Sequence, residues 1–428
     1  MGGLKSRLSR LKELGLAKAS SLEKPPAPPT LSPAPSAAST ATSKVRERAG
    51  PEGWEKGEAN EYWRIVGTSF SIGLSELEEG FDLRFFLPKD KGSGRRGRFE
   101  DLAFFDFETT GLSGGTGTLA FLAAVGWFEG PDLRVCQVFM DDFPGEAAFL
   151  QRVLHLLGRR KLVATYNGGS FDMPLLRTRC VLNRIPCPDH GHMDLLPPAR
   201  RLWSGAFASC ALQELERELL GYERIDDIPG FLIPRIWLDY SSGKDEVEGD
   251  FPDEQDSRRL MDRVFAHNLR DIVSLARLFF LMGRIADDPV GRGPETKVNC
   301  RRLAAYLAET GREGEGEALF QSAWEGGEPL AGLGLARLRR RAGDLHGYGA
   351  ILASIQGKDP RIWIEKAKYW EHSRKDYPQA LSCAVRARED LGRREAGLSE
   401  GLRRRLDEDI ELRMARLRRK SERAGKAP

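Results

Sequence analysis

The chain has 428 residues, and 40% of them are hydrophobic, which is enough for two or three domains with at least one sizeable core. Its formal net charge is only +3, so any attraction to phosphate groups must come from local patches rather than from the whole protein. Runs of about 18 apolar residues and the apolar stretch of a secretory signal are both missing, which argues against a membrane-spanning or exported protein. Six scattered cysteines favour free thiols, and we expect a cytoplasmic protein.

Residues 1–60 are predicted to be a disordered tether. Leucines recur at helical spacing between Leu4 and Leu14 among basic residues, and residues 24–43 are rich in Pro, Ala, Ser and Thr. The short basic amphipathic helix would either contact a partner or a membrane surface, or be a solvated terminus. The first six residues also fit the loose myristoylation pattern, which often matches by chance.

Strand and helix patterns from residue 61 onward predict an α/β protein. Residues 61–100 are expected to form a small β element and a basic loop that precede the main domain, because aromatic and β-branched residues alternate there. Residues 101–286 are expected to form the main domain, in which a meander of strands is followed by alternating helices and strands. The expected elements are strands at 102–108, 119–128, 133–140 and 161–166, and helices at 146–157, from Asp172 onward and at 257–285.

Beyond residue 296 the strand pattern ends, and Ala, Leu, Arg and Glu recur at helical spacing. We therefore predict a separate all-α domain over residues 296–428. The spacing of aromatic and small residues from Trp363 to Ala387 resembles tetratricopeptide-like helix pairs. Residues 393–426 carry 12 Lys or Arg against 7 Asp or Glu. This basic helix would either cap the repeats or contact nucleic acid.

Two acidic residues, Asp106 and Glu108, stand two positions apart in an apolar strand, so their side chains project to the same face. A half-buried pair of like charges is tolerated chiefly when a counter-charge neutralises it. Hard oxygen ligands of this kind favour Mg²⁺ or Mn²⁺. The alternative is a strand end at which both carboxylates are solvated.

Two further candidate positions lie downstream. Asp172 follows a glycine-containing turn and enters a helix two residues before Pro174, which by itself is an ordinary helix start. His267 and Asp271 are four residues apart on the last predicted helix of the main domain and therefore share one face. There an imidazole and a carboxylate can meet the same ion and the same attacking water. The alternative for this pair is an exposed position on the helix.

A zinc site made by Cys180, Cys187, His190 and His192 is a further possibility. The two cysteines are spaced too widely for a zinc ribbon, and no second cysteine pair supports them. We therefore expect a loop without a metal in this segment.

In chain order, these segments resemble the motifs of a known superfamily. The segment that begins at Asp106, Asp-Phe-Glu-Thr-Thr-Gly-Leu, resembles a motif of DnaQ-like proofreading exonucleases. The segment from Tyr166 to Leu176 resembles a motif of the same exonucleases and of family B polymerase proofreading domains. The segment His-Asn-Leu-Arg-Asp that begins at His267, together with residues 192–196 and 225–230, resembles the YprB-type ribonuclease H-like family.

The resemblance covers about residues 100–285 and implies a ribonuclease H-like mixed sheet flanked by helices. It also implies a DEDD-type 3′-5′ exonuclease that acts on single-stranded nucleic acid. Asp106, Glu108, Asp172 and Asp271 would hold two divalent cations, Mg²⁺ or Mn²⁺, about 4 Å apart. His267 would deprotonate or orient the attacking water.

The resemblance has one departure and implies further roles. In DnaQ-like proteins the histidine stands five residues before its aspartate, where this chain has Ala266, whereas His267 stands at the position at which another subclass has tyrosine. Thr109 and Asn167 are expected to contact substrate. Asp194 is expected to cap a helix or accept a buried hydrogen bond rather than bind a metal.

Two other functions remain open from the sequence. The domain could be a non-catalytic scaffold that binds nucleic acid or protein, although a site without catalysis needs none of the retained acids. It could also be an endonuclease on the same fold. Either RNA or DNA fits, because discrimination depends on contacts with the 2′-hydroxyl group that no motif encodes. The helical repeats are expected to dock a protein partner.

Overall fold

The computed structural model describes residues 51–57, 61–70, 80–87, 96–111, 117–225, 227–245, 256–393 and 398–424. Residues 1–50 of the predicted N-terminal tether, with their amphipathic and myristoylation patterns, lie outside these ranges, as does most of the predicted basic loop. Residues 51–57 are described, and Glu55 and Lys56 form a short strand that pairs with Trp63 and Tyr62, so the prediction of a disordered tether is wrong for this stretch. Among the described helices, none combines the length and the apolar character that crossing a bilayer requires.

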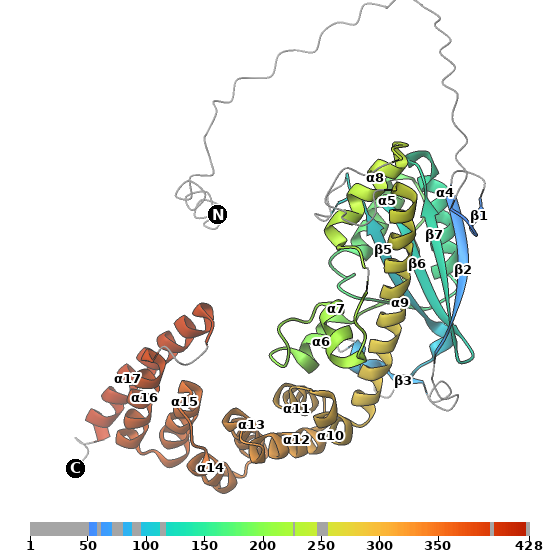
Figure 1. The fold of residues 1–428 in the computed structure, drawn as a ribbon. Helices are drawn as coiled ribbons and strands as arrows, with labels where there is room; N and C mark the ends of the chain where they lie inside the picture. Colours follow the sequence, from blue (N-terminus) through green and yellow to red (C-terminus); the bar gives the residue numbers. More distant parts are fainter. Residues whose placement is uncertain are drawn as a thin grey trace, which may run out of the picture. The chain divides into compact units, whose positions relative to one another are not determined.

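A mixed sheet of seven strands forms the centre of the main domain (Figure 1). Its strands are β1 (Glu55–Lys56), β2 (Glu61–Ser69), β5 (Leu102–Thr109), β6 (Ala120–Glu129), β7 (Asp132–Met140), β8 (Leu162–Thr165) and β9 (Gly191–Asp194). They lie in the order β1-β2-β7-β6-β5-β8-β9. The predicted meander β5-β6-β7 is antiparallel, whereas β8 is parallel to β5 and β9 is parallel to β8. The predicted α/β class is confirmed.

The strand β2 is part of this central sheet. It pairs along its whole length with β7, from Glu61 opposite Met140 to Ser69 opposite Asp132. Sequence patterns placed this segment in a small element before the main domain, because they carry no information about distant pairing partners. A second sheet consists of β3 (Phe81–Asp82) and β4 (Arg96–Gly97), and the short helix α3 (Leu83–Phe86) follows β3.

Helices cover both faces of the sheet. They are α4 (Glu146–Leu157), α5 (Asp172–Leu182), α6 (Leu196–Trp203), α7 (Leu212–Leu215), α8 (Ile233–Ser241) and α9 (Ser257–Asp287), with short turns η1 (Phe99–Asp101), η2 (Phe143–Gly145), η3 (Glu216–Leu220) and η4 (Gly230–Leu232). Phe104 of β5 contacts Phe279 of α9 with ring centroids 5.7 Å apart, and Phe107 stacks on Phe149 of α4. Because side chains alternate along a strand, Asp106 and Glu108 share the α9 face with Phe104.

The C-terminal region is all helical, as predicted. Its elements are α10 (Pro289–Arg292), η5 (Pro294–Thr296), α11 (Cys300–Glu309), α12 (Glu313–Glu325), α13 (Pro329–Arg341), α14 (Leu345–Ser354), α15 (Pro360–Lys368), η6 (Tyr369–Arg374), α16 (Tyr377–Gly392) and α17 (Glu400–Ala424). The first of these helices contact the main domain directly: Trp203 Nε1 donates to the Thr296 carbonyl at 3.0 Å, and the Tyr306 hydroxyl donates to the Arg84 carbonyl at 2.9 Å. The tetratricopeptide-like character and the domain limits remain predictions.

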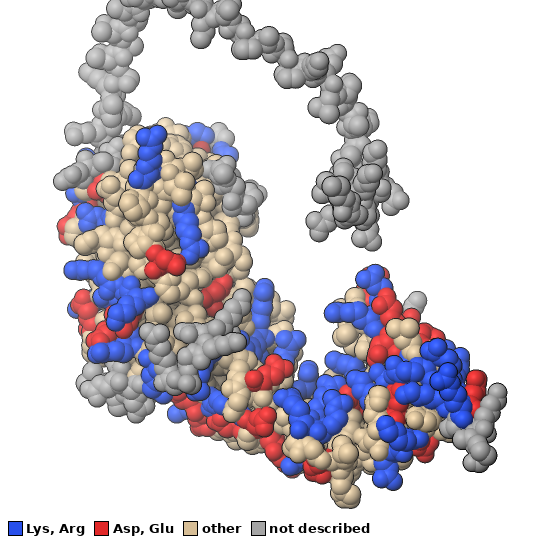
Figure 2. Space-filling view, turned by 180° about the vertical axis from the view of Figure 1, so that it is seen from behind, with Lys and Arg blue, Asp and Glu red and all other residues tan. Residues whose placement is uncertain are grey.

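The basic helix α17 packs against the preceding helices through charged as well as apolar side chains. Arg413, Arg416 and Lys420 all donate to the carboxylate of Glu371, at 3.1, 2.9 and 2.9 Å, and Glu371 is buried. Further Lys and Arg side chains gather over the surface of these helices, interspersed with acidic ones (Figure 2). This packing favours the capping role among the two that the sequence left open.

Candidate active site

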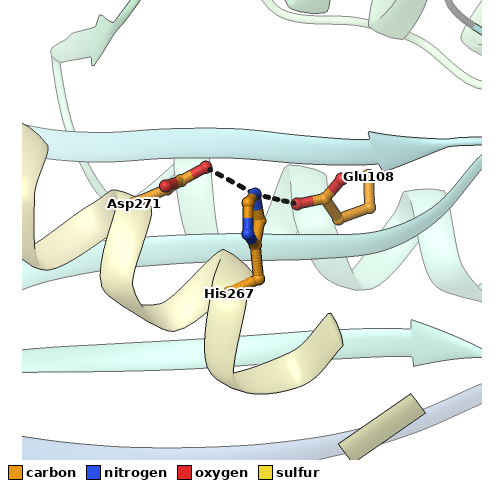
Figure 3. Close-up of side chains that lie close together, drawn as sticks. All are labelled: Glu108, His267 and Asp271. Carbon is orange, nitrogen blue, oxygen red and sulfur yellow. Dashed lines mark ion pairs between the residues drawn. The ribbon is translucent and has the colours of Figure 1, made fainter. Parts of the chain in front are cut away.

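Strand β5 and helix α9 bring Glu108, His267 and Asp271 together (Figure 3). The imidazole Nε2 of His267 lies 3.5 Å from Asp271 Oδ2 and 3.9 Å from Glu108 Oε1. Asp271 follows His267 by one helical turn, and Glu108 reaches them from the end of the strand. These side chains are 8 to 17% exposed, so the site is largely shielded from solvent.

Asp172 joins this group from the first turn of α5. The turn before it is tight: a Cβ on Gly168 would lie 2.3 Å from Thr165 Oγ1 and 2.9 Å from Asp172 Oδ2, so only glycine fits. The backbone N–H of Phe107 in β5 hydrogen-bonds to the Asp172 carboxylate. The glycine in the motif therefore allows the turn to close and the carboxylate to reach the strand that carries Asp106.

The four carboxylates repel one another in a buried environment. Burial raises the pKa of Asp106 well above its ordinary value, and the charges of Asp271, Asp172 and Glu108 raise it further. Burial also raises the pKa of Glu108 to about 8 and that of Asp172 to about 7, and it raises the pKa of Asp271 despite the nearby His267 and Arg224. The carboxylates can therefore all ionise near neutral pH only if added positive charge compensates them.

The donor set fits a divalent cation. Glu108, His267 and Asp271 each offer one ligand atom, and these atoms lie within 4.8 Å of one another. The charges of Glu108 and Asp271 raise the pKa of Asp106, and the charge of Asp271 raises that of Asp172. Carboxylate oxygens with at most one imidazole nitrogen suit hard ions such as Mg²⁺ and Mn²⁺.

The four side chains of the alternative zinc site do not form such a group of potential ligands in the described part of the chain. Among the described residues, the one group of three or more potential ligands close enough to share an ion is that of Glu108, His267 and Asp271. His192 Nε2 instead lies 2.8 Å from the Thr165 hydroxyl oxygen. Cys180 and Cys187 are free thiols, as are the other four cysteines of the chain.

Asp227 is a site residue that sequence reasoning did not identify. Its Oδ1 lies 2.8 Å from His267 Nδ1, so the imidazole bonds to one carboxylate and directs Nε2 toward the acidic cluster. Burial alone would lower the pKa of His267, but the Asp227 hydrogen bond and the charges of Asp271 and Glu108 raise it to about 9. Burial alone would raise the pKa of Asp227, but the pairing with His267 and Arg224 lowers it to about 2.

Arg224 is a second residue that sequence reasoning missed. Its guanidinium, 6% exposed, donates to Asp271, to both oxygens of Glu216 and, at 3.0 Å, to Asp227. Glu216 is buried in the π-helical turn η3, a conformation that is frequent at functional sites. The sequence pointed to these residues only indirectly. Asp227 lies within the segment 225–230 that resembles the YprB-type family, and Arg224 immediately precedes it.

The remaining predicted residues occupy the turns around the site. The Thr109 hydroxyl donates to the Gly111 carbonyl at 2.9 Å, next to a shift in the pairing of β5 with β6. Asn167 is exposed with a φ of 63°, and its N–H donates to Asp194 Oδ1 at 2.8 Å. Asp194 also accepts from the N–H of Leu196 at 3.0 Å, at the start of α6, so it is a hydrogen-bond acceptor there, although the N-cap position of α6 is Leu195. Substrate contact by Thr109 and Asn167 remains a prediction.

The stability of the metal-free protein is expected to fall as the pH rises from about 5 to about 9. With pKa values of about 8 for Glu108 and about 7 for Asp172, the folded state holds protons that the unfolded chain has already released. His267, with a pKa of about 9, also binds its proton more tightly when folded and acts in the same direction. We expect the free energy of unfolding in EDTA, measured by urea titration, to decrease over this range by about 1.4 kcal/mol for each unit by which a folded-state pKa exceeds its unfolded value.

The matched variant for this measurement is Glu108→Gln, which removes one of the titrating groups. In this variant the free energy of unfolding should depend less on pH. Added Mg²⁺ should restore most stability at the alkaline end, where the carboxylates are ionised. A wild-type stability that stays constant or increases over this pH range would contradict the raised pKa values.

The chain is similar in sequence to a known protein family and to a bacterial protein, and in structure to part of a DNA polymerase. Residues 103–282 match the family described as the RNase_H superfamily. The chain is 31% identical over 333 residues to the uncharacterized protein YprB of Bacillus subtilis (strain 168), and the match covers 75% of each chain. Among solved structures, a family B DNA polymerase from the hyperthermophilic archaeon Pyrobaculum calidifontis is 15% identical with a TM-score of 0.33, over 50% of this chain and 29% of the polymerase.

Proposed function

Since this chain belongs to the YprB family and carries an RNase_H superfamily domain, we propose that it is a metal-dependent nuclease that removes nucleotides from single-stranded 3′ ends. The observation that carries the proposal is the shielded group of Glu108, His267 and Asp271, together with the buried Asp106 and Asp172, whose pKa values the charge of Asp271 raises. A fold does not need such a costly group of like charges for its stability. A protein that binds divalent cations and hydrolyses phosphodiester bonds does need it.

In this proposal the carboxylates hold two divalent cations, which when bound supply Lewis-acid activation of water and stabilisation of the leaving oxygen. His267 Nε2, which faces Glu108 and Asp271, would take the proton from the attacking water once the charge of the bound cations has lowered the raised pKa of the imidazole, or would orient that water. Asp227 fixes the ring by its bond to Nδ1. Arg224 balances part of the negative charge and holds one oxygen of Asp271.

The direction of cleavage and the substrate contacts follow from the sequence motifs. The segments around Asp106 and Asp172 resemble those of proofreading exonucleases, which remove nucleotides from a single-stranded 3′ end. Thr109 and Asn167, at the rim of the cluster, would contact the terminal nucleotide. The C-terminal helices would serve as a platform for a protein partner or for the rest of a long substrate.

The proposal is tested with 5′-labelled single-stranded RNA and DNA in the presence of Mg²⁺ or Mn²⁺. We expect products that shorten progressively from a free 3′ hydroxyl, no shortening in EDTA, and protection by an inverted 3′-terminal nucleotide. Internal cleavage of the protected substrate would favour the endonuclease alternative. Binding of both substrates without any hydrolysis would favour the non-catalytic scaffold.

A further inference from the structure

A row of directly opposed residues crosses the sheet and ends at Asp106. Arg64 of β2 pairs with Gln137 of β7, Gln137 pairs with Ala124 of β6, and Ala124 pairs with Asp106 of β5. Residues opposite one another on neighbouring strands present their side chains on the same face of the sheet. Three of these four side chains are polar, although the face lies under helix α9.

Hydrogen bonds join this row into one chain through Asn268 of α9. Arg64 Nε and Nη2 donate to Gln137 Oε1 at 2.9 and 2.8 Å. Gln137 Nε2 donates to Asn268 Oδ1 at 3.1 Å, and Asn268 Nδ2 donates to Asp106 Oδ2 at 3.0 Å. Ala124 is the small residue in the row, so its methyl group leaves space for Asn268 to enter between Gln137 and Asp106.

The chain is buried and each amide has a fixed orientation. Gln137 and Asn268 are 0% exposed, and each amide accepts at its oxygen and donates from its nitrogen. Hydrogen bonds in series strengthen one another in such a low-dielectric environment. Removal of one member leaves a buried partner unsatisfied, which is costly.

The same glutamine also holds helix α9. Gln137 Nε2 donates to the backbone carbonyl of Phe265 at 2.8 Å, three residues before Asn268. The outer end of the chain is held by stacking, because the Arg64 guanidinium lies 4.7 Å from the centroid of the Trp54 ring and 5.7 Å from that of Phe265. The sheet therefore fixes both the position of α9, which carries His267 and Asp271, and the carboxylate of Asp106.

We propose that Arg64, Gln137 and Asn268 are positioning residues that orient the Asp106 carboxylate for cation binding, through a chain that starts at β2 and runs along the α9 face of the sheet. The inference rests on the proposed function for the role of Asp106 as a metal ligand. Polar groups that orient a metal ligand from outside the coordination sphere typically contribute about 10- to 100-fold to metal affinity. None of these three residues needs to contact substrate or cation.

The first test measures Mn²⁺ binding to the full-length protein by titration calorimetry. We expect Asn268→Ala to weaken binding by about 10- to 100-fold and Gln137→Leu and Arg64→Met to weaken it by smaller factors, in that order. Arg64→Lys should retain more affinity than Arg64→Met, because an ammonium group can still donate to Gln137 Oε1. The control is Arg134→Met, which removes a β7 arginine that pairs with the exposed Glu129 and should leave affinity unchanged.

A double-variant comparison separates positioning from general destabilisation. Once Asn268→Ala has broken the chain, adding Arg64→Met should weaken Mn²⁺ binding no further. Gln137→Leu is left out of this comparison, because Gln137 also bonds to the Phe265 carbonyl and so holds α9 independently of Asn268. Losses that simply add, or wild-type affinity in Asn268→Ala, would overturn the inference.

The link between Asn268 and Asp106 can also be tested without metal. In EDTA, the changes in Tm caused by Asn268→Ala and Asp106→Ala should be non-additive, because each variant removes one partner of the same hydrogen bond. Additive changes would overturn the inference. A wild-type protein that binds no Mn²⁺ would instead refute the proposed function, and the metal-free comparison would still decide whether Asn268 positions Asp106.

Discussion

Replacing Asp106, Asp172 or Asp271 singly by alanine is expected to abolish metal-dependent hydrolysis while the protein remains folded. The three carboxylates come from β5, α5 and α9, and the charge of Asp271 raises the pKa of both Asp106 and Asp172, so each variant removes one of the proposed ligands from the same site. We expect turnover at saturating Mg²⁺ to fall by about 10³-fold or more, which corresponds to about 4 kcal/mol of transition-state stabilisation. The measurement is the rate of shortening of a 5′-labelled oligonucleotide.

The folded state should tolerate these changes, because each one removes a member of a mutually repelling group. Circular dichroism and the metal-free Tm provide the check. The control is Asp189→Ala, which removes a carboxylate that is 93% exposed and pairs only at the surface with Arg177. Near wild-type turnover in any of the three variants would show that the residue is not a ligand.

His267→Ala is expected to lower turnover by about 10²- to 10⁴-fold, the usual contribution of a general base, with little change in metal affinity. The imidazole is held at Nδ1 by Asp227 and directs Nε2 to the space beside Glu108 and Asp271. His267→Tyr, which places a hydroxyl at the position used by the related subclass, should retain more activity than His267→Ala. Single-turnover rates and Mn²⁺ calorimetry measure the two quantities separately.

Asp227→Asn tests whether Asp227 acts on turnover through His267. It should lower turnover in the wild-type background but have little further effect when His267 is already alanine, because Asp227 acts through the imidazole. Loss of metal affinity in His267→Ala would make the histidine a ligand. An unchanged rate would mean that the cations alone activate the water.

Local patterns were sufficient to predict the elements that carry the site. The predicted helix at 146–157 has the same limits as α4, and the helix predicted from Ser257 begins there because Asp256 accepts hydrogen bonds from the N–H groups of Arg258 and Arg259. Capping residues, turn glycines and hydrophobic periodicity all act within a few positions of the element they define. The predicted order of elements is correct for the same reason.

Contacts between distant segments were not predictable in this way. Arg224 reaches Asp271 across 47 residues, and Gln137 reaches Asn268 across 131. Nothing in a single sequence distinguishes the buried arginine from the many exposed ones. The sequence placed Asp227 in a family-like segment, but its pairing with His267 depends on how that segment folds back onto α9.

The hydrophobic clusters indicate which helices unfold together with the sheet and which can unfold separately. One cluster is continuous from Phe81 through α9 to Leu338 of α13, so the first C-terminal helices should unfold cooperatively with the sheet. Another cluster, from Ile364 to Leu417, belongs to α15, α16 and α17 alone. We therefore expect α16 and α17, which share this cluster only with α15 and the turn after it, to exchange their amide hydrogens by partial opening while the carboxylate cluster stays assembled.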